Sequence, residues 1–307
     1  MTAPFFIVGF QRSGTTLLRL MLDSHPELAV PLDTVGLWAR YDAKLPEYSH
    51  LATAEDARRM VTDLVAEERI GLWQVPLTVD SVLAYRRLPG FPGIMDAFHL
   101  AYAAARGKRA WGDKDPGNML RLSTIVRWFP EARVLHIVRD GRDACLSHKT
   151  QSFGITDELA CASAWREQVW WVRRMGELMG PTRYWEVRYE DLVGEPARQL
   201  MEACAFLGIA YSPSMLEYHR SVDRAIPREK RHIWPLAGEP PRADNVGRWR
   251  TVMSPSMRVA FERRAGGLLR ELGYETLPGL PRGGHLAELR SLLSRAADMV
   301  RVRLSGR

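Results

Sequence analysis

The pattern of hydrophobic and polar positions begins with a strand and a helix at the N-terminus. Residues 4–10 are almost entirely apolar, a length that suits a buried strand. A short polar turn follows, and the apolar positions over 17–22 then recur at helical spacing. Pro26 ends this helix, because proline cannot continue the helical backbone. The N-terminus therefore predicts a strand–loop–helix unit.

The same pattern recurs along the chain. Two further units have predicted strands over 133–138 and 184–188, followed by helices over about 144–150 and 196–207, the second capped by Gly208. Helical periodicity also appears over about 54–69, opened by Thr53, and over 93–106, 117–128 and 157–179. Strands that alternate with helices predict an α/β fold of three layers, in which helices cover both faces of a parallel sheet.

The last part of the chain is different in character. Residues 225–250 combine several prolines with many basic residues and predict a long ordered loop or lid. Residues 286–307 place leucine, alanine and valine on one helical stripe with arginine on the others. We expect one domain over 1–280, with an insertion at about 35–110, and a helical extension over 281–307 that packs on this chain or forms a homodimer.

Composition narrows the class of protein. The 307 residues are 46% hydrophobic and 26% charged, which is typical of a globular protein. No apolar run approaches the length of a membrane span, and the N-terminal apolar run lacks the basic flank of a signal peptide. Cys145, Cys161 and Cys204 are far apart, which argues against a zinc cluster and a disulfide framework and assigns them only to packing. These features predict a cytoplasmic protein.

The charge balance indicates an anionic partner. Lys and Arg number 43 against 36 Asp and Glu, so the formal net charge is +7. No basic cluster with interleaved aromatic residues appears, so we expect no nucleic-acid partner. A non-catalytic nucleotide-binding protein remains an alternative.

The first strand-to-helix turn carries the clearest candidate chemistry. Its residues are Gly9-Phe10-Gln11-Arg12-Ser13-Gly14-Thr15-Thr16. The two glycines have the spacing of a phosphate-binding loop, in which backbone N–H groups and a helix N-terminus hold an anion. A nucleotide triphosphatase or kinase requires lysine after the second glycine, where this chain has Thr15. The cation is Arg12 instead. A small-molecule kinase remains an alternative, and so does a simple tight turn with a solvated arginine.

These residues resemble a known family. Arg12-Ser13-Gly14-Thr15-Thr16-Leu17 looks like the 5′-phosphosulfate loop of sulfotransferases that use 3′-phosphoadenosine 5′-phosphosulfate (PAPS). Further matches, in the same chain order as in the family, are Asp23-Ser24-His25-Pro26, Lys114-Asp115-Pro116, Arg139 to Ser147, Tyr189-Glu190-Asp191-Leu192 and Asn245-Val246-Gly247-Arg248-Trp249. The chain is most similar to bacterial relatives of the tyrosylprotein sulfotransferase branch.

The resemblance implies an enzyme that moves a sulfuryl group from PAPS to a hydroxyl, a phenol or an alcohol, of a small molecule, glycan or peptide. The product is 3′,5′-ADP (PAP), and no metal is required. The residues implied to bind the nucleotide are Arg12, Ser13, Gly14, Thr15, Thr16, Arg139, Ser147, Tyr189 and Arg248. Relatives often have another basic residue four positions after Ser147, where this chain has Gln151. His148, Lys149 or Arg248 would supply that charge.

Catalysis also requires a base for the acceptor hydroxyl. Asp33 stands where the tyrosylprotein branch has its glutamate base, and like that base it is followed by threonine. A turn or cap role is the plain alternative for Asp33. His25 and Asp113 are the next candidates for the base, although a structural role at the end of the first helix is favoured for His25.

Two further features concern the acceptor side. Lys114 is the expected additional cation on the sulfuryl group, with a solvated lysine as the alternative. The segment 35–110 is rich in aromatic side chains, which either line an acceptor pocket or fill the core: Trp38, Tyr41, Tyr48, Trp73, Tyr85, Phe91, Phe98 and Tyr102. The identity of the acceptor does not follow from these residues.

Overall fold

The computed structural model describes residues 3–32, 34, 36–149, 154–233 and 235–279. These residues form two compact units, each made of two stretches of chain. The first unit contains the chain up to Arg139 together with Trp171–Val246, and the second contains Asp140–Trp170 together with the chain from Gly247 onward. Three features named above lie outside the described residues: the candidate base Asp33, Gln151 and the predicted helical extension over 281–307.

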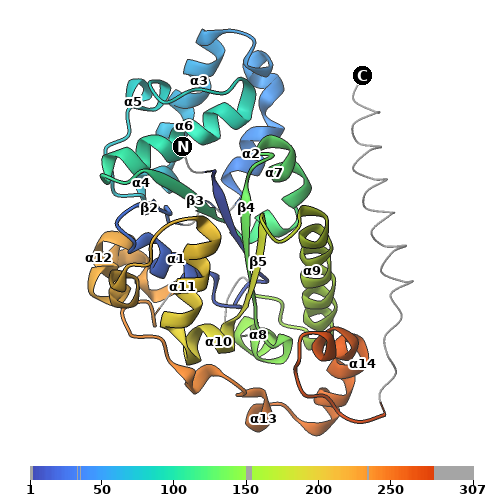
Figure 1. Cartoon of the computed structure of the whole chain (residues 1–307). Helices are drawn as coiled ribbons and strands as arrows, with labels where there is room; N and C mark the ends of the chain where they lie inside the picture. The colour runs from blue at the N-terminus through green and yellow to red at the C-terminus, as the bar shows by residue number, and fades with distance from the viewer. Residues whose placement is uncertain (1–2, 33, 35, 150–153, 234, 280–307) are drawn as a thin grey trace. The chain divides into compact units, whose positions relative to one another are not determined.

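The first unit is built on a parallel sheet of five strands (Figure 1). The strands are β1 (Phe5–Val8), β2 (Leu28–Ala29), β3 (Ala110–Lys114), β4 (Arg133–Val138) and β5 (Tyr184–Arg188). Their spatial order is β2-β3-β1-β4-β5, so β1 lies at the centre. Phe5 of β1 pairs with Gly112 on one side and with Arg133 on the other. The three predicted strands are confirmed, and the two-residue β2 was too short to give a pattern.

Successive residues of β1 point to opposite faces of the sheet, because side chains alternate along a strand. Phe6 joins one hydrophobic cluster, and Phe5 and Ile7 join the other. The first cluster is covered chiefly by α2 (Leu37–Ala43), α3 (Ala54–Val65), α5 (Val79–Leu83), α6 (Gly90–Ala105) and α7 (Leu122–Trp128). The second is covered by α1 (Thr15–Asp23), α10 (Tyr189–Gly194) and α11 (Pro196–Leu207). The predicted three-layer α/β fold is therefore confirmed.

Local sequence signals explain where several of these helices begin and end. Thr53 caps α3 and accepts the N–H of Asp56, whose carboxylate in turn accepts the N–H of Thr53, forming a capping box. Gly208 ends α11 at a φ of 69°, a left-handed conformation that glycine adopts without strain. Both helices were predicted from the sequence. The segment predicted as a long loop, 225–250, instead contains short helical turns.

Those turns and the remaining short helices complete the element order. They are η1 (Leu45–Leu51), α4 (Glu68–Gly71), η2 (Pro116–Met119), η3 (Pro213–Ser221), α12 (Val222–Ala225), η4 (Arg228–Ile233), η5 (Ala243–Asn245) and α13 (Trp249–Val252). A lid function for 225–250 stays a prediction.

The aromatic residues of 35–110 fill the core beneath α6. All except Tyr85 are buried: Trp38, Tyr41, Tyr48, Trp73, Phe91, Phe98 and Tyr102. Fully burying one large apolar side chain contributes about 1.5–3 kcal/mol, so these residues stabilise this face of the sheet strongly. Core filling, the second of the two sequence interpretations, is what their burial supports.

A polar cluster joins β4 to β5 inside the first unit. His136 is fully buried, and its Nδ1 lies 2.7 Å from the hydroxyl of Tyr184. That hydroxyl donates to Oε2 of Glu186 at 2.7 Å. Burial alone would raise the pKa of Glu186, but the hydrogen bonds from His136 and Tyr184 outweigh it and lower the pKa to about 2.

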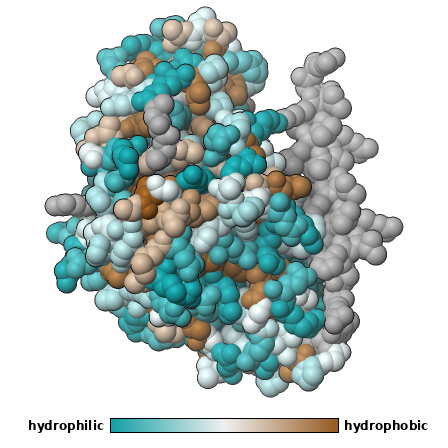
Figure 2. Space-filling model, in the orientation of Figure 1, coloured by the Kyte–Doolittle hydropathy of each residue, from teal (hydrophilic) through white to brown (hydrophobic). Residues whose placement is uncertain are grey.

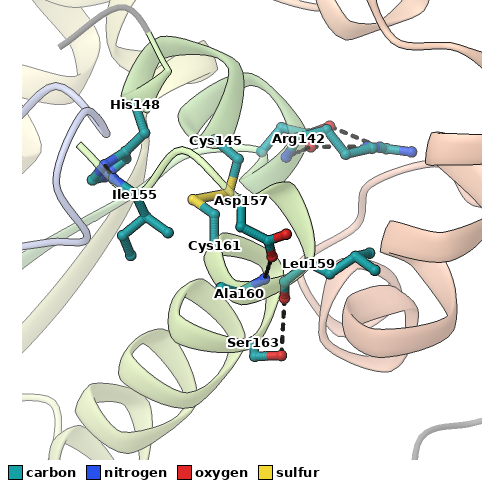
Figure 3. Close-up of a disulfide and its surroundings, with 10 residues drawn as sticks. Arg142, Cys145, His148, Ile155, Asp157, Leu159, Ala160, Cys161 and Ser163 are labelled. Atoms are coloured by element: carbon teal, nitrogen blue, oxygen red, sulfur yellow. Dashed lines mark hydrogen bonds and ion pairs between the residues drawn. A yellow bond between two sulfur atoms is a disulfide. The ribbon is translucent and has the colours of Figure 1, made fainter. Parts of the chain in front are cut away.

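The second unit contains α8 (Gly141–His148), the beginning of α9 (Glu158–Met179), α13 and α14 (Pro255–Glu271). A disulfide joins Cys145 of α8 to Cys161 of α9, whose Cα atoms are 5.8 Å apart (Figure 3). The prediction that the cysteines serve only in packing was therefore wrong for this pair. Linear spacing hid the contact, because the two cysteines lie on different helices, 16 positions apart in the sequence. Buried Cys204 stays unpaired, and cytoplasmic localisation, which rested partly on the cysteines, stays a prediction.

The surface carries few exposed large hydrophobic side chains among the described residues: Leu88, Leu120, Leu178, Met201, Leu236 and Val252. On the face shown in Figure 2, hydrophobic residues form separate brown patches between hydrophilic ones. Scattered apolar residues of this kind are ordinary for a protein surface. Within the part of the chain that is described, no helix has the length and hydrophobicity needed to cross a membrane.

Candidate nucleotide-binding and catalytic site

The loop between β1 and α1 is tightly built. Ser13 donates its N–H to the carbonyl of Phe10 at 3.0 Å, and Gly14 caps α1 at a φ of 94°. A Cβ on Gly14 would lie 2.5 Å from the ring of Tyr189. A Cβ on Gly9 would lie 2.5 Å from the carbonyl oxygen of Ile137 in β4. Only glycine fits at either position, and both glycines of the predicted loop are thereby explained.

Hydrogen-bond donors gather where α1 begins. The N–H groups of its first turn, from Thr15 onward, have no partner within the helix, and they carry the positive end of the helix dipole. Ser13 is fully buried, and its hydroxyl has no hydrogen-bond partner among the described residues. A buried hydroxyl without a partner is costly, so this geometry favours a ligand that bonds to it. The arrangement is typical of an anion-binding site.

Two arginines meet beside this loop. Arg139, at the end of β4, donates from Nη1 to the carbonyl of Arg12 at 3.0 Å and from Nη2 to the carbonyl of Asn245 at 2.6 Å. Its guanidinium lies over the ring of Tyr189, 4.7 Å from the ring centre. Burial, and then the charge of Arg139, lower the pKa of Arg12. Two cations held this close favour a multiply charged anion, which would relieve their repulsion.

The backbone of Arg12 has a φ of 69°, a left-handed conformation that is uncommon for a residue other than glycine. Such a conformation costs about 1–2 kcal/mol and persists where its surroundings require it. The hydrogen bond from Arg139 to the Arg12 carbonyl is one such requirement. The strain lies at the residue expected to contact the 5′-phosphosulfate and to stabilise the leaving group.

Lys114 ends β3 and is buried, next to Ile7 of β1 in the sheet. It therefore reaches the same carboxyl edge of the parallel sheet as the loop, which is where ligands bind in such sheets. The solvated alternative for Lys114 does not fit its burial. Its role toward a sulfuryl group stays a prediction.

Asp113, the neighbour of Lys114, is fully buried in a hydrogen-bond network. It accepts from the Thr34 hydroxyl at 2.9 Å and from the Asn118 amide at 2.7 Å, and its Oδ1 lies 3.2 Å from Nε2 of His99. Burial would raise the pKa of Asp113, but the bonds from His99, Asn118 and Thr34 lower it. A carboxylate occupied in this way does not suit a base, although it was one of the predicted alternatives.

Asp115 continues the same arrangement. It accepts the N–H of Gly36 at 2.8 Å and the N–H of Gly117 at 2.8 Å. The second bond caps η2, so Asp115 starts this short helix. The aspartates on either side of Lys114 therefore hold Thr34 and Gly36, which follow the candidate base Asp33 in the chain.

His25 is fixed by structural bonds. Its Nδ1 accepts the N–H of Glu27 at 3.0 Å, and its Nε2 lies 2.8 Å from the carbonyl of Ala210. Its structural role after the first helix, favoured from the sequence, agrees with these contacts.

The remaining predicted ligands belong to the second unit. Ser147 lies on α8, and Arg248 directly precedes α13. Arg142, inside the same motif, is fully buried against Asp140 and Glu262 and lies 3.6 Å from the centre of the Trp249 ring. It therefore serves packing and ion pairing.

Sequence reasoning named Asp113 only as a candidate base and missed its hydrogen-bond network. It also missed the contacts of Asp143, whose carboxylate accepts the N–H groups of Gly247 and Trp249. In each case the sequence showed no more than an aspartate in or beside a motif. Among the residues described here, no three His, Cys, Asp or Glu side chains gather as a metal site, and the expectation that no metal is required stays a prediction.

A parallel α/β sheet with a glycine loop, an arginine pair and no lysine after the second glycine defines a class of phosphate-binding protein distinct from nucleotide triphosphatases. Residues 4–213 match the sequence profile described as the Sulfotransferase family. The chain belongs to the sulfotransferase family and is a transferase.

Named relatives and solved structures agree. Protein-tyrosine sulfotransferase A of Caenorhabditis elegans is 25% identical over 304 residues, covering 94% of this chain and 72% of the relative. Protein-tyrosine sulfotransferase 2 of Gallus gallus is 28% identical over 226 residues, which cover 71% of this chain but only 54% of the relative. The chain thus spans about half the length of the second relative.

Solved structures share the fold. The sulfotransferase domain from the Synechococcus PCC 7002 olefin synthase has a TM-score of 0.61 at 24% identity, covering 90% of this chain and 96% of that one. Mouse sulfotransferase SULT7A1 complexed with PAP has a TM-score of 0.50 at 14% identity, covering 88% and 86%. At these identities the likeness shows the fold alone.

Proposed function

We propose that this protein transfers the sulfuryl group of PAPS to a hydroxyl and releases PAP. The observation that carries the proposal is the convergence of Arg12 and Arg139 beside the partnerless Ser13 hydroxyl at the start of α1. These groups fit a nucleotide with several negative charges. Mouse SULT7A1, which shares the fold, was solved with PAP, and this supports the choice of donor.

In the reaction, the bond between sulfur and the oxygen bridging to the nucleotide breaks as sulfur bonds to the acceptor oxygen. Negative charge develops on the bridging oxygen. Arg12 and the N–H groups of Thr15 and Thr16 are oriented before the reaction, so they stabilise that charge without reorganising. Lys114 is assigned to the oxygens of the moving group. Arg139, Ser147 and Arg248 are assigned to the 3′-phosphate, for which the planar guanidinium fork is well suited.

The acceptor hydroxyl must lose a proton as sulfur is attacked. We assign that proton to the carboxylate of Asp33. Asp113 and Asp115 support this role, because they hold Thr34 and Gly36 in place beside Lys114. The names of the relatives make tyrosine peptides the first acceptors to test, ahead of small phenols, alcohols and glycans.

The decisive experiment is titration calorimetry with PAP, followed by an acceptor screen with labelled PAPS. We expect PAP binding without added metal, and sulfate transfer to at least one hydroxyl compound. A folded protein that does not bind PAP would contradict the proposal.

The base is tested separately. Asp33→Asn should lose turnover and keep PAP affinity, because the assigned base acts on the acceptor hydroxyl and has no assigned role in binding the nucleotide. Asp42→Asn, which removes a carboxylate paired with Arg121, is the control and should keep turnover. Full turnover of Asp33→Asn would exclude that residue as the base.

A further inference from the structure

The 3′-phosphate of the nucleotide needs a cation, and this inference rests on the proposed function. Position 151 is an uncharged glutamine, and the sequence offers three cations for this role: His148, Lys149 and Arg248. All three belong to the second unit, so their surroundings are directly comparable.

Two of the three are already engaged. His148 is buried, and its Nδ1 accepts the N–H of Ile155 at 3.2 Å (Figure 3). This ring nitrogen is therefore occupied by a backbone hydrogen bond. Lys149 forms an ion pair with Glu158 at the start of α9, and the hydrogen bond from Lys149 lowers the pKa of Glu158.

Arg248 has a different environment. It is exposed, and within the described ranges no hydrogen bond or ion pair of its side chain is found. Its backbone, by contrast, is firmly held. Asp143 is buried and accepts the N–H of Gly247 at 2.6 Å through one carboxylate oxygen and the N–H of Trp249 at 2.8 Å through the other. The carboxylate thus binds both neighbours of Arg248.

The position of Asp143 on α8 determines which face of the helix holds the Arg248 segment. Asp143 and Ser147 are four residues apart on the helix, so they lie on one face, one turn from each other. The aspartate therefore anchors the Arg248 segment to the face of α8 that also carries Ser147. Trp249, which follows Arg248, is buried and packs against the guanidinium of Arg142. This contact holds the C-terminal side of the Arg248 segment.

We propose that Asp143 is a positioning residue for the 3′-phosphate, which holds Arg248 in place, in the same unit as Ser147, to bind that phosphate. Asp143 itself contacts no substrate. Its two bonds convert a flexible surface arginine into one whose backbone is fixed before the nucleotide binds, which lowers the entropy cost of binding.

The test compares PAP with 5′-AMP, which lacks the 3′-phosphate. Arg248→Ala should weaken PAP by about tenfold to a hundredfold, the usual effect of losing a charged hydrogen bond, and leave 5′-AMP unchanged. Asp143→Asn should show the same selective loss, because the amide repels one of the two N–H groups. The double variant should bind PAP no more weakly than Arg248→Ala alone, since both changes remove one interaction. The KM for PAPS should rise in each variant more than kcat falls.

Asp157→Asn is the matched control. It alters another carboxylate of the same unit, one that accepts the N–H of Ala160 at 2.6 Å, and the ratio of PAP to 5′-AMP affinity should stay at its wild-type value. Asp143→Glu, which keeps the charge but displaces the segment, should lose part of the discrimination and serves if the asparagine variant does not fold. Equal losses for PAP and 5′-AMP, or losses that add in the double variant, would overturn the proposal. A wild-type protein that binds no PAP would instead overturn the proposed function.

Discussion

Arg12 allows function and stability to be separated at one position. Its side chain faces the charge of Arg139, and its backbone has a φ of 69°. Replacing it by alanine removes the repulsion but leaves a Cβ in the left-handed conformation. Replacing it by glycine removes the repulsion and also the strain of that conformation, because glycine has no Cβ. We therefore expect the two variants to lose activity equally and to differ in stability.

The expected magnitudes follow from these two features. Removing a donor that stabilises developing charge lowers kcat by about 100-fold to 1000-fold, so both variants should be nearly inactive. A left-handed conformation costs about 1–2 kcal/mol in a residue with a Cβ, and glycine's own entropy offsets part of that gain. The glycine variant should be more stable than the alanine variant by about 1 kcal/mol, or a Tm higher by about 2–4 °C.

The assay combines turnover of labelled PAPS with thermal unfolding of the nucleotide-free protein. Arg12→Lys keeps the charge and is the control, with activity above that of either other variant. Turnover close to wild type in Arg12→Ala would refute the catalytic role. A glycine variant no more stable than the alanine variant would refute the strained backbone.

The other predictions concern stability. Gly14→Ala should lower the free energy of unfolding by about 3 kcal/mol, since its Cβ meets a tyrosine ring, whereas Gly36→Ala, with open space around it, should lose only about 1 kcal/mol in the same denaturant titration. Cys145→Ser should lower the free energy of unfolding by about 3 kcal/mol, as expected for opening a disulfide with a sequence separation of 16. It should also remove the effect of reductant on Tm. Cys204→Ser is the control and should leave that effect unchanged. The pKa of Glu186, about 2, lies below its ordinary 4.5, so its stabilisation is complete above pH 4.5 and is lost as pH falls toward 2. Glu186→Gln should therefore reduce the loss of unfolding free energy between pH 4.5 and pH 2. An unchanged loss in that range would exclude this carboxylate as its cause.

Sequence patterns predicted the fold well where they were long and periodic. The strands over 133–138 and 184–188 and the helix ended by Gly208 agree with the structure, because buried parallel strands are continuous apolar runs and helix ends have their own residue preferences. The loop from Gly9 to Thr16 was also predicted, since its glycines are required by contacts with β4 and Tyr189.

What the sequence did not reveal depends on residues brought together from distant parts of the chain. The bond between Asp143 and the Gly247 backbone spans 104 positions, and the one between Asp113 and Thr34 spans 79. Nothing in local periodicity signals a side chain that binds a distant backbone. The disulfide was missed for a related reason. Linear spacing does not show that Cys145 of α8 and Cys161 of α9 lie next to each other.

The bond between Cys145 and Cys161 closes a covalent ring around residues 146–160. A protease that cuts any one peptide bond in this interval leaves two segments that remain joined through sulfur. Such a cut chain would keep its full mass on a non-reducing gel and separate into two fragments only when a thiol is added. Cleavage and fragmentation are therefore separate events in this part of the protein, and the reducing power of the surroundings decides whether the first leads to the second.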